Sequence, residues 1–168
     1  TLYTFLIQAH RLSLLPGSPF AYWVSRRIHA AFSSIPGLSA NGREAVIGAS
    51  TKDDFRFLRL AVEVPLAERV KINALNQVAS GTWIPLAKGG AAISFYMNLD
   101  LMINWRRNGN ELKALISEYR GSRGWGSQWS AELKPRSFSF RPGITWGRRS
   151  SGLRFKVLPR HSMFADKG

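Results

Sequence analysis

Residues 83–119, WIPLAKGGAAISFYMNLDLMINWRRNGNELKALISEY, contain the strongest folding signals of the chain. Trp83–Ala87 and Phe95–Trp105 are apolar runs typical of buried strands. Asn108-Gly109 is a turn pair, and apolar residues between Glu111 and Tyr119 recur at helical spacing. The stretch therefore predicts two strands followed by a helix, which indicates an α+β domain.

The N-terminal part is predicted to be helical. Apolar residues of segment 2–15 recur at helical spacing up to Pro16-Gly17. Ser18 followed by Pro19 then suits the start of a second helix, which we expect to end at Pro36-Gly37. Residues 1–37 are therefore predicted to form a helical hairpin that connects to a part of the protein not contained in this sequence.

Residues 38–168 are predicted to form an α+β domain that is incomplete at its C-terminal end. We expect a short strand at Ala45–Ile47, a helix that Asp53 or Asp54 caps and that runs to Ala61, and a mixed, mostly antiparallel sheet. Three later segments alternate as strands do: Phe138–Phe140, Ile144–Trp146 and Leu153–Val157. The sequence therefore predicts helices in its first part, helices and strands in its middle part and mostly strands in its last part.

The charge of the chain is strongly positive and unevenly distributed. Its formal net charge is +14, of which +10 comes from residues 103–168. Between Tyr119 and Arg160, ten Lys and Arg residues accompany a single acid, Glu132, and three tryptophans. Cations that neutralise phosphates, together with planar groups that engage bases, indicate a DNA- or RNA-binding surface. The alternative is a basic surface that serves only solubility.

Composition excludes several other classes of protein. The chain has no cysteine, which excludes disulfides, thiolate catalysis and cysteine-based zinc sites and fits a reducing bacterial cytoplasm. No segment approaches the roughly 20 apolar residues of a membrane span. A glycine-rich turn for a cofactor or phosphate is also missing, so no cofactor is predicted to bind this segment.

The predicted DNA contacts are exposed cations and two tryptophans. Arginine binds phosphates and guanine edges in a bidentate way, and most such contacts position the protein on the DNA backbone. Lys88 lies beside two glycines, where a backbone can approach a phosphate, although a plain turn between strands explains it equally well. The full set is Lys88, Arg106, Arg107, Arg120, Arg123, Trp125, Trp129, Arg136, Arg148, Arg149 and Arg154.

Two alternative functions remain open from the residues alone. Asp100 followed by Glu111 and Lys113 has the loose D…ExK order with which some nucleases bind a divalent metal. Helix formation by the 111–119 segment explains the same residues without a metal. A basic surface can also dock to an acidic partner protein.

Five blocks resemble one protein family. They are PGSPFAYWVS at 16–25, GASTKDDFRFLRLAVEV at 48–64, WIPLAKGGAAISFY at 83–96, INWRRNGNELK at 103–113 and RPGITWGRRSSGLRFKVLP at 141–159. Taken in this order, they are similar to the C-terminal half of PglX-like adenine-specific DNA methyltransferases of BREX phage defence. That family is related to fused restriction-modification enzymes of the Eco57I and MmeI kind.

The resemblance implies a target-recognition fragment that binds double-stranded DNA and is inactive alone. The parent protein would be a site-specific adenine methyltransferase, with S-adenosylmethionine bound in a domain that precedes Thr1. The implied partners are DNA, that methyltransferase domain and other proteins of the defence system.

Overall fold

The computed structural model describes residues 8–17, 19, 23–72, 78–88, 95, 96, 98–133, 138–146 and 155–165. Its α-helices are α1 (Ala9–Leu12), α2 (Arg26–Ser34), α3 (Asp54–Phe57) and α4 (Arg106–Ser122), and its strands are β1 (Leu58–Leu60), β2 (Lys71–Ile72), β3 (Val78–Ser80), β4 (Trp83–Ala87), β5 (Leu101–Asn104), β6 (Gly143–Trp146), β7 (Phe155–Leu158) and β8 (Met163–Phe164). Short 3₁₀ turns connect several of these elements, among them η4 (Trp129–Ala131).

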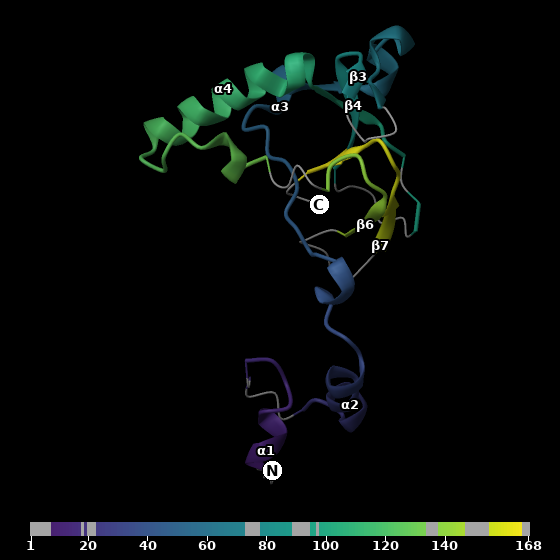
Figure 1. The fold of residues 1–168 in the computed structure, drawn as a ribbon, viewed down its shortest axis with the longest axis vertical. Helices are drawn as coiled ribbons and strands as arrows, with labels where there is room; N and C mark the ends of the chain where they lie inside the picture. Colours follow the sequence, from purple (N-terminus) through teal and green to yellow (C-terminus); the bar gives the residue numbers. More distant parts are fainter. Residues whose placement is uncertain are drawn as a thin grey trace, which may run out of the picture. The chain divides into compact units, whose positions relative to one another are not determined.

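The chain divides into two compact units, Thr1–Ala45 and Val46–Gly168. The first contains α1 and α2, and the second contains all the strands together with α3 and α4 (Figure 1). The predicted boundary after residue 37 lies near this division. The roles assigned to the two parts stay predictions.

The predicted N-terminal helical hairpin is not seen. In the described residues α1 spans only Ala9–Leu12, and α2 begins at Arg26, after Trp23 and Val24, which are not helical. Ser25 is the N-cap of α2, because its hydroxyl accepts a hydrogen bond from the Ile28 backbone N–H at 3.4 Å. No residue of α2 is buried, so its apolar face does not pack in the way a hairpin requires. The predicted cap, Ser18, lies outside the described residues.

The sheet of the second unit has the order β1-β5-β4-β8. Strands β1, β5 and β4 are antiparallel neighbours, whereas β8 runs parallel to β4 with Met163 opposite Leu86. Two antiparallel ribbons, β2–β3 and β6–β7, complete the β-structure. The predicted mixed, mostly antiparallel sheet is therefore confirmed.

Several predicted elements form, but with shorter bounds. The Asp53 cap is confirmed, because its carboxylate accepts a hydrogen bond from the Arg56 N–H at 3.0 Å, yet α3 ends at Phe57 and the chain continues as β1. Among the described residues of the strand predicted for 95–105, only those of β5 form a strand. Residues 45–47 form no strand, and residues 138–140 form a turn in which Phe140 has a φ of +69°. The alternation of apolar and polar residues at 138–140 predicts a strand, but the left-handed backbone of Phe140 interrupts the extended conformation that a strand needs.

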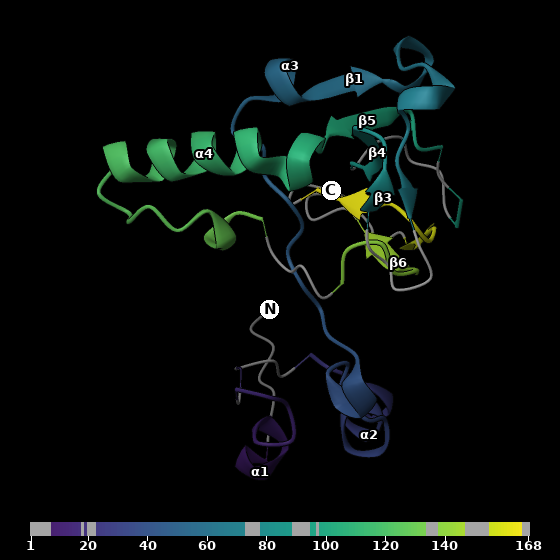
Figure 2. The same ribbon diagram turned by 45° about the horizontal axis from the view of Figure 1, so that its top comes forward.

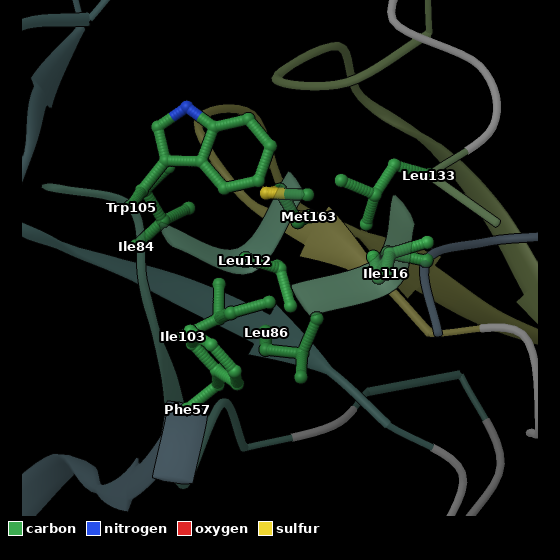
Figure 3. Packing of buried hydrophobic residues seen from close by; sticks show 10 residues of the cluster. Phe57, Ile84, Leu86, Ile103, Trp105, Leu112, Ile116, Leu133 and Met163 are labelled. Carbon is green, nitrogen blue, oxygen red and sulfur yellow. The ribbon is translucent and has the colours of Figure 1, made fainter. Parts of the chain in front are cut away.

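The hydrophobic core lies between the sheet and α4 (Figure 3). Ile84 and Leu86 of β4 and Ile103 of β5 are buried against Leu112 and Ile116, which lie one helical turn apart on α4. Burying each such side chain stabilises the fold by about 1.5–3 kcal/mol. Phe57, Trp105, Leu133 and Met163 extend the same cluster. This packing holds α4 against the sheet.

Candidate nucleic-acid interface

The junction between β5 and α4 is a left-handed turn. Arg107, Asn108 and Gly109 have φ values of +50°, +60° and +71°, so regular helix begins only after them. The Asn104 side-chain oxygen accepts a hydrogen bond from the Arg106 N–H at 3.0 Å, and the Gly109 N–H donates to the Trp105 carbonyl at 3.1 Å. The predicted turn at Asn108-Gly109 is therefore confirmed. It presents Arg106 and Arg107 to solvent.

Lys113 belongs to the interior of this junction. Its Nζ lies 5.5 Å from the ring centroid of Trp105 and 5.0 Å from that of Trp129, and it donates a hydrogen bond to the Asn108 carbonyl. Both contacts with the rings are cation–π interactions. Trp129 is half-buried and packs against the core, and its contact with DNA stays a prediction.

The geometry does not favour the metal-nuclease alternative. Two residues apart on a helix, Glu111 and Lys113 point to opposite sides, with Glu111 exposed and Lys113 buried. The Glu111 carboxylate is bound by the Arg56 guanidinium at 2.6 Å. Within the described part of the chain, His, Asp and Glu side chains form no group of three that could hold a metal ion.

A charged network fastens the end of α4 to the segment that follows it. The Glu132 carboxylate forms two ion pairs, one from Oε2 to Lys52 Nζ at 2.7 Å and one from Oε1 to Arg120 Nη1 at 2.9 Å. These two cations, Lys52 first, hold the pKa of the Glu132 carboxyl below its ordinary value, although partial burial opposes the shift. Arg120, predicted to contact DNA, is thus engaged in an internal ion pair.

Arg120 also holds the backbone of Trp125. Its Nη2 donates to the Trp125 carbonyl at 2.7 Å, and the Trp125 N–H donates to the Arg120 carbonyl at 3.0 Å. The tip of α4 and the loop after it project away from the sheet (Figure 2). Trp125 is therefore presented at a fixed point of a protruding loop.

Arg123 and two aromatic rings gather at this tip. The Arg123 guanidinium carbon lies 4.5 Å from the ring centroid of Tyr119 and 5.4 Å from that of Trp125. The rings of Tyr119 and Trp125 meet edge to face with centroids 6.3 Å apart. Trp125 remains 53% exposed. We call Tyr119, Arg123 and Trp125 the α4-tip cluster.

The remaining predicted contacts are distributed over the second unit. Lys88 is half-buried at the end of β4 and forms an ion pair with Asp54. Arg106 and Arg107 are exposed at the opposite end of α4 from the α4-tip cluster. Arg136, Arg148, Arg149 and Arg154 lie outside the described residues.

Sequence reasoning did not identify Tyr119 or Lys52 as part of the site. Tyr119 and Arg123 are four residues apart, so the helical period would have brought them together if the predicted helix had been extended by one turn. Lys52 also lies 5.6 Å from the Tyr119 ring centroid, a contact between distant segments that no local pattern indicates.

Two curated proteins are similar to almost the entire chain. The adenine-specific methyltransferase PglX of Lacticaseibacillus casei (strain Zhang) is 28% identical over 99% of the chain. The adenine-specific methyltransferase BrxX of Escherichia coli O9:H4 (strain HS) is 29% identical over 92% of it. The chain is similar to a segment of PglX-like proteins. The resemblance predicted from the five blocks is thereby confirmed.

The similarity covers only a small part of these PglX-like proteins. The chain spans 14% of the length of PglX and 11% of that of BrxX. No protein-family profile matches the sequence. One block that carries the PglX resemblance, residues 103–113, forms the junction of β5 and α4, so its Asn, Trp, Gly and Lys have structural roles.

No helix in the described part of this PglX-like segment is both long enough and apolar enough to cross a membrane.

Proposed function

We propose that this chain is a DNA-contacting, target-recognition segment of a longer adenine-specific DNA methyltransferase that acts in phage defence. The α4-tip cluster carries this proposal, because it combines an exposed guanidinium with an exposed aromatic ring on a protruding element. The similarity to PglX and BrxX supports the methyltransferase assignment.

We propose that this segment contacts DNA and that the rest of the longer protein carries out the methylation. Arginines at the two ends of α4, Arg106 and Arg107 at one end and Arg123 at the other, would engage the DNA backbone and fix the position of the protein along it. S-adenosylmethionine and the catalytic groups would be held by the part of the longer protein that this sequence does not contain. The segment alone would then bind DNA without methylating it.

The test is the affinity of the 168-residue chain for a duplex, measured by fluorescence polarisation over a series of salt concentrations. The double variant Arg106→Gln/Arg107→Gln should weaken binding to every duplex sequence and lower the salt slope by about 0.9 for each phosphate that the variant no longer neutralises. Its matched control is Arg26→Gln/Arg27→Gln, an adjacent exposed pair on α2 that removes the same charge. Equal losses of affinity from both variants would attribute the effect to net charge, and absence of duplex binding would refute the proposal.

Arg148 and Arg149 can be tested in the same assay. We predict from the sequence that neutralising this pair weakens binding to all sequences and flattens the salt dependence. An unchanged affinity and an unchanged salt slope would remove these two residues from the proposed interface.

A further inference from the structure

We infer that Trp125 and Arg123 form a binding site for an unpaired base of DNA. This inference rests on the proposed function and deepens it, since it assigns to the α4-tip cluster a ligand different from the phosphates of a duplex. The ligand is a nucleobase whose flat face is not covered by a neighbouring base.

The way in which Trp125 is held distinguishes it from a tryptophan that only packs. The core tryptophan Trp105 is 7% exposed, whereas Trp125 is 53% exposed although both its backbone N–H and its carbonyl are bonded to Arg120. Arg120 is in turn bound to Glu132. An exposed ring on a fixed backbone loses little conformational freedom when a ligand stacks on it.

The chemistry of the cluster suits a base. Bases stack on indole rings and on guanidinium planes, and this interaction tolerates any base because each has a π face. In a fully paired duplex these faces are covered by neighbouring base pairs, so only a base that has left the stack can use them. The positive charge of Arg123 also attracts the phosphate next to such a base.

The loop leaves room for a strand to approach. Gly124 and Gly126 flank Trp125, and a Cβ atom placed on either glycine would meet no other atom within 4 Å. The backbone on either side of Trp125 therefore carries no side chain, and the space beside both glycines is open. A nucleic-acid strand can reach the ring without displacing a side chain from these positions.

The experiment compares three DNA molecules of the same sequence with the 168-residue chain: a fully paired duplex, a duplex with one bulged, unpaired base, and a single strand. We expect tighter binding to the two DNAs that contain unpaired bases. Trp125→Ala should weaken binding to these two by roughly 5- to 150-fold, the usual effect of removing a stacking ring. Binding of the fully paired duplex should change by less than about 2-fold, because phosphate contacts do not involve the ring.

Matched variants separate stacking from folding defects. Trp125→Phe keeps a flat ring and should retain most of the preference for unpaired bases, while Arg123→Lys keeps the charge, loses the guanidinium plane and should reduce that preference. Trp23→Ala removes another exposed tryptophan, in the first unit, and should change nothing. Circular dichroism and the melting temperature check that each variant is folded.

The outcomes distinguish this inference from the proposed function. If the chain binds the paired duplex but shows no preference for unpaired bases, or keeps its preference in a folded Trp125→Ala variant, the inference is wrong and the proposed function stands. If the chain binds none of the three DNAs, both are wrong. A preference that Trp125→Ala abolishes and Trp125→Phe retains supports the inference.

Discussion

At the scale of single residues, Glu132 organises the end of α4. The acid is bound by Lys52 and Arg120, and Arg120 also bonds both backbone groups of Trp125. One carboxylate thereby couples three segments of the second unit. Removing it would leave two neighbouring cations without their anion, which costs more than the loss of an exposed ion pair.

This network predicts a defined dependence of stability on pH. Because folding lowers the pKa of Glu132, its contribution is fully present above the ordinary glutamate value and is lost as the pH falls through the lowered value. Glu132→Gln should lower the free energy of unfolding at neutral pH by about 1–3 kcal/mol, as expected for hydrogen bonds to a charged group. Urea unfolding of both proteins from neutral to acidic pH should show the difference shrinking in acid. A difference that does not depend on pH would contradict this role of Glu132.

At the scale of elements, the β5–α4 junction determines where the helix points. The turn contains three successive left-handed residues, and two of them are not glycine. Lys113 bonds the Asn108 carbonyl from within the following helix, and Trp105 packs beneath the turn. The unusual backbone is therefore held by contacts on both sides, as strained turns require.

Gly109 is the residue in this turn that should tolerate substitution least. Its φ is +71°, and an added Cβ would lie 3.0 Å from the Trp105 ring. Gly109→Ala should therefore destabilise the protein by about 1–3 kcal/mol, the sum of a left-handed alanine and a tight contact. The matched control is Gly121→Ala in the same helix, where an added Cβ meets nothing within 4 Å and a gain of about 0.5–1 kcal/mol is expected. Thermal unfolding of the two variants measures both effects, and equal melting temperatures would contradict the prediction.

At the scale of the whole molecule, the sheet is completed by residues far apart in the chain. Met163 of β8 pairs with Leu86 of β4 and is buried in the core. The Ala49 N–H donates to the Phe164 carbonyl at 2.7 Å, so both ends of the second unit meet at this strand. The described core residues that surround α4 all come from this unit.

We therefore expect residues 46–168 to fold without residues 1–45. Their melting transition should remain cooperative and lie close to that of the full chain, because the clustered core residues are retained. A chain ending at residue 160 should instead lose at least about 2–5 kcal/mol, since the burial of Met163 disappears together with strand β8. Differential scanning calorimetry of the two truncated chains compares these effects. A non-cooperative transition in 46–168 would show that the first unit is needed for folding.

Much of the local structure could be predicted from the sequence, since it depends on residues that are near one another in the chain. The strand at 83–87, the Asp53 cap, the turn at Asn108-Gly109 and the helix after it each follow from a pattern or from turn chemistry. Predictions that needed packing between segments were less accurate. The helical hairpin is not seen in the described residues, where α2 has no buried side chain.

The sequence by itself determined the charge of the chain, its resemblance to PglX-like proteins, and the main helix and strands of the second unit. Only the tertiary structure decided which charged residues bind one another. Arg120 and Arg123 are the same residue type, three positions apart. Arg120 is paired with Glu132, whereas Arg123 lies over the rings of Tyr119 and Trp125. The physical reason is that periodicity is encoded by neighbours in the chain, whereas an ion pair or a stacked ring depends on how distant segments pack.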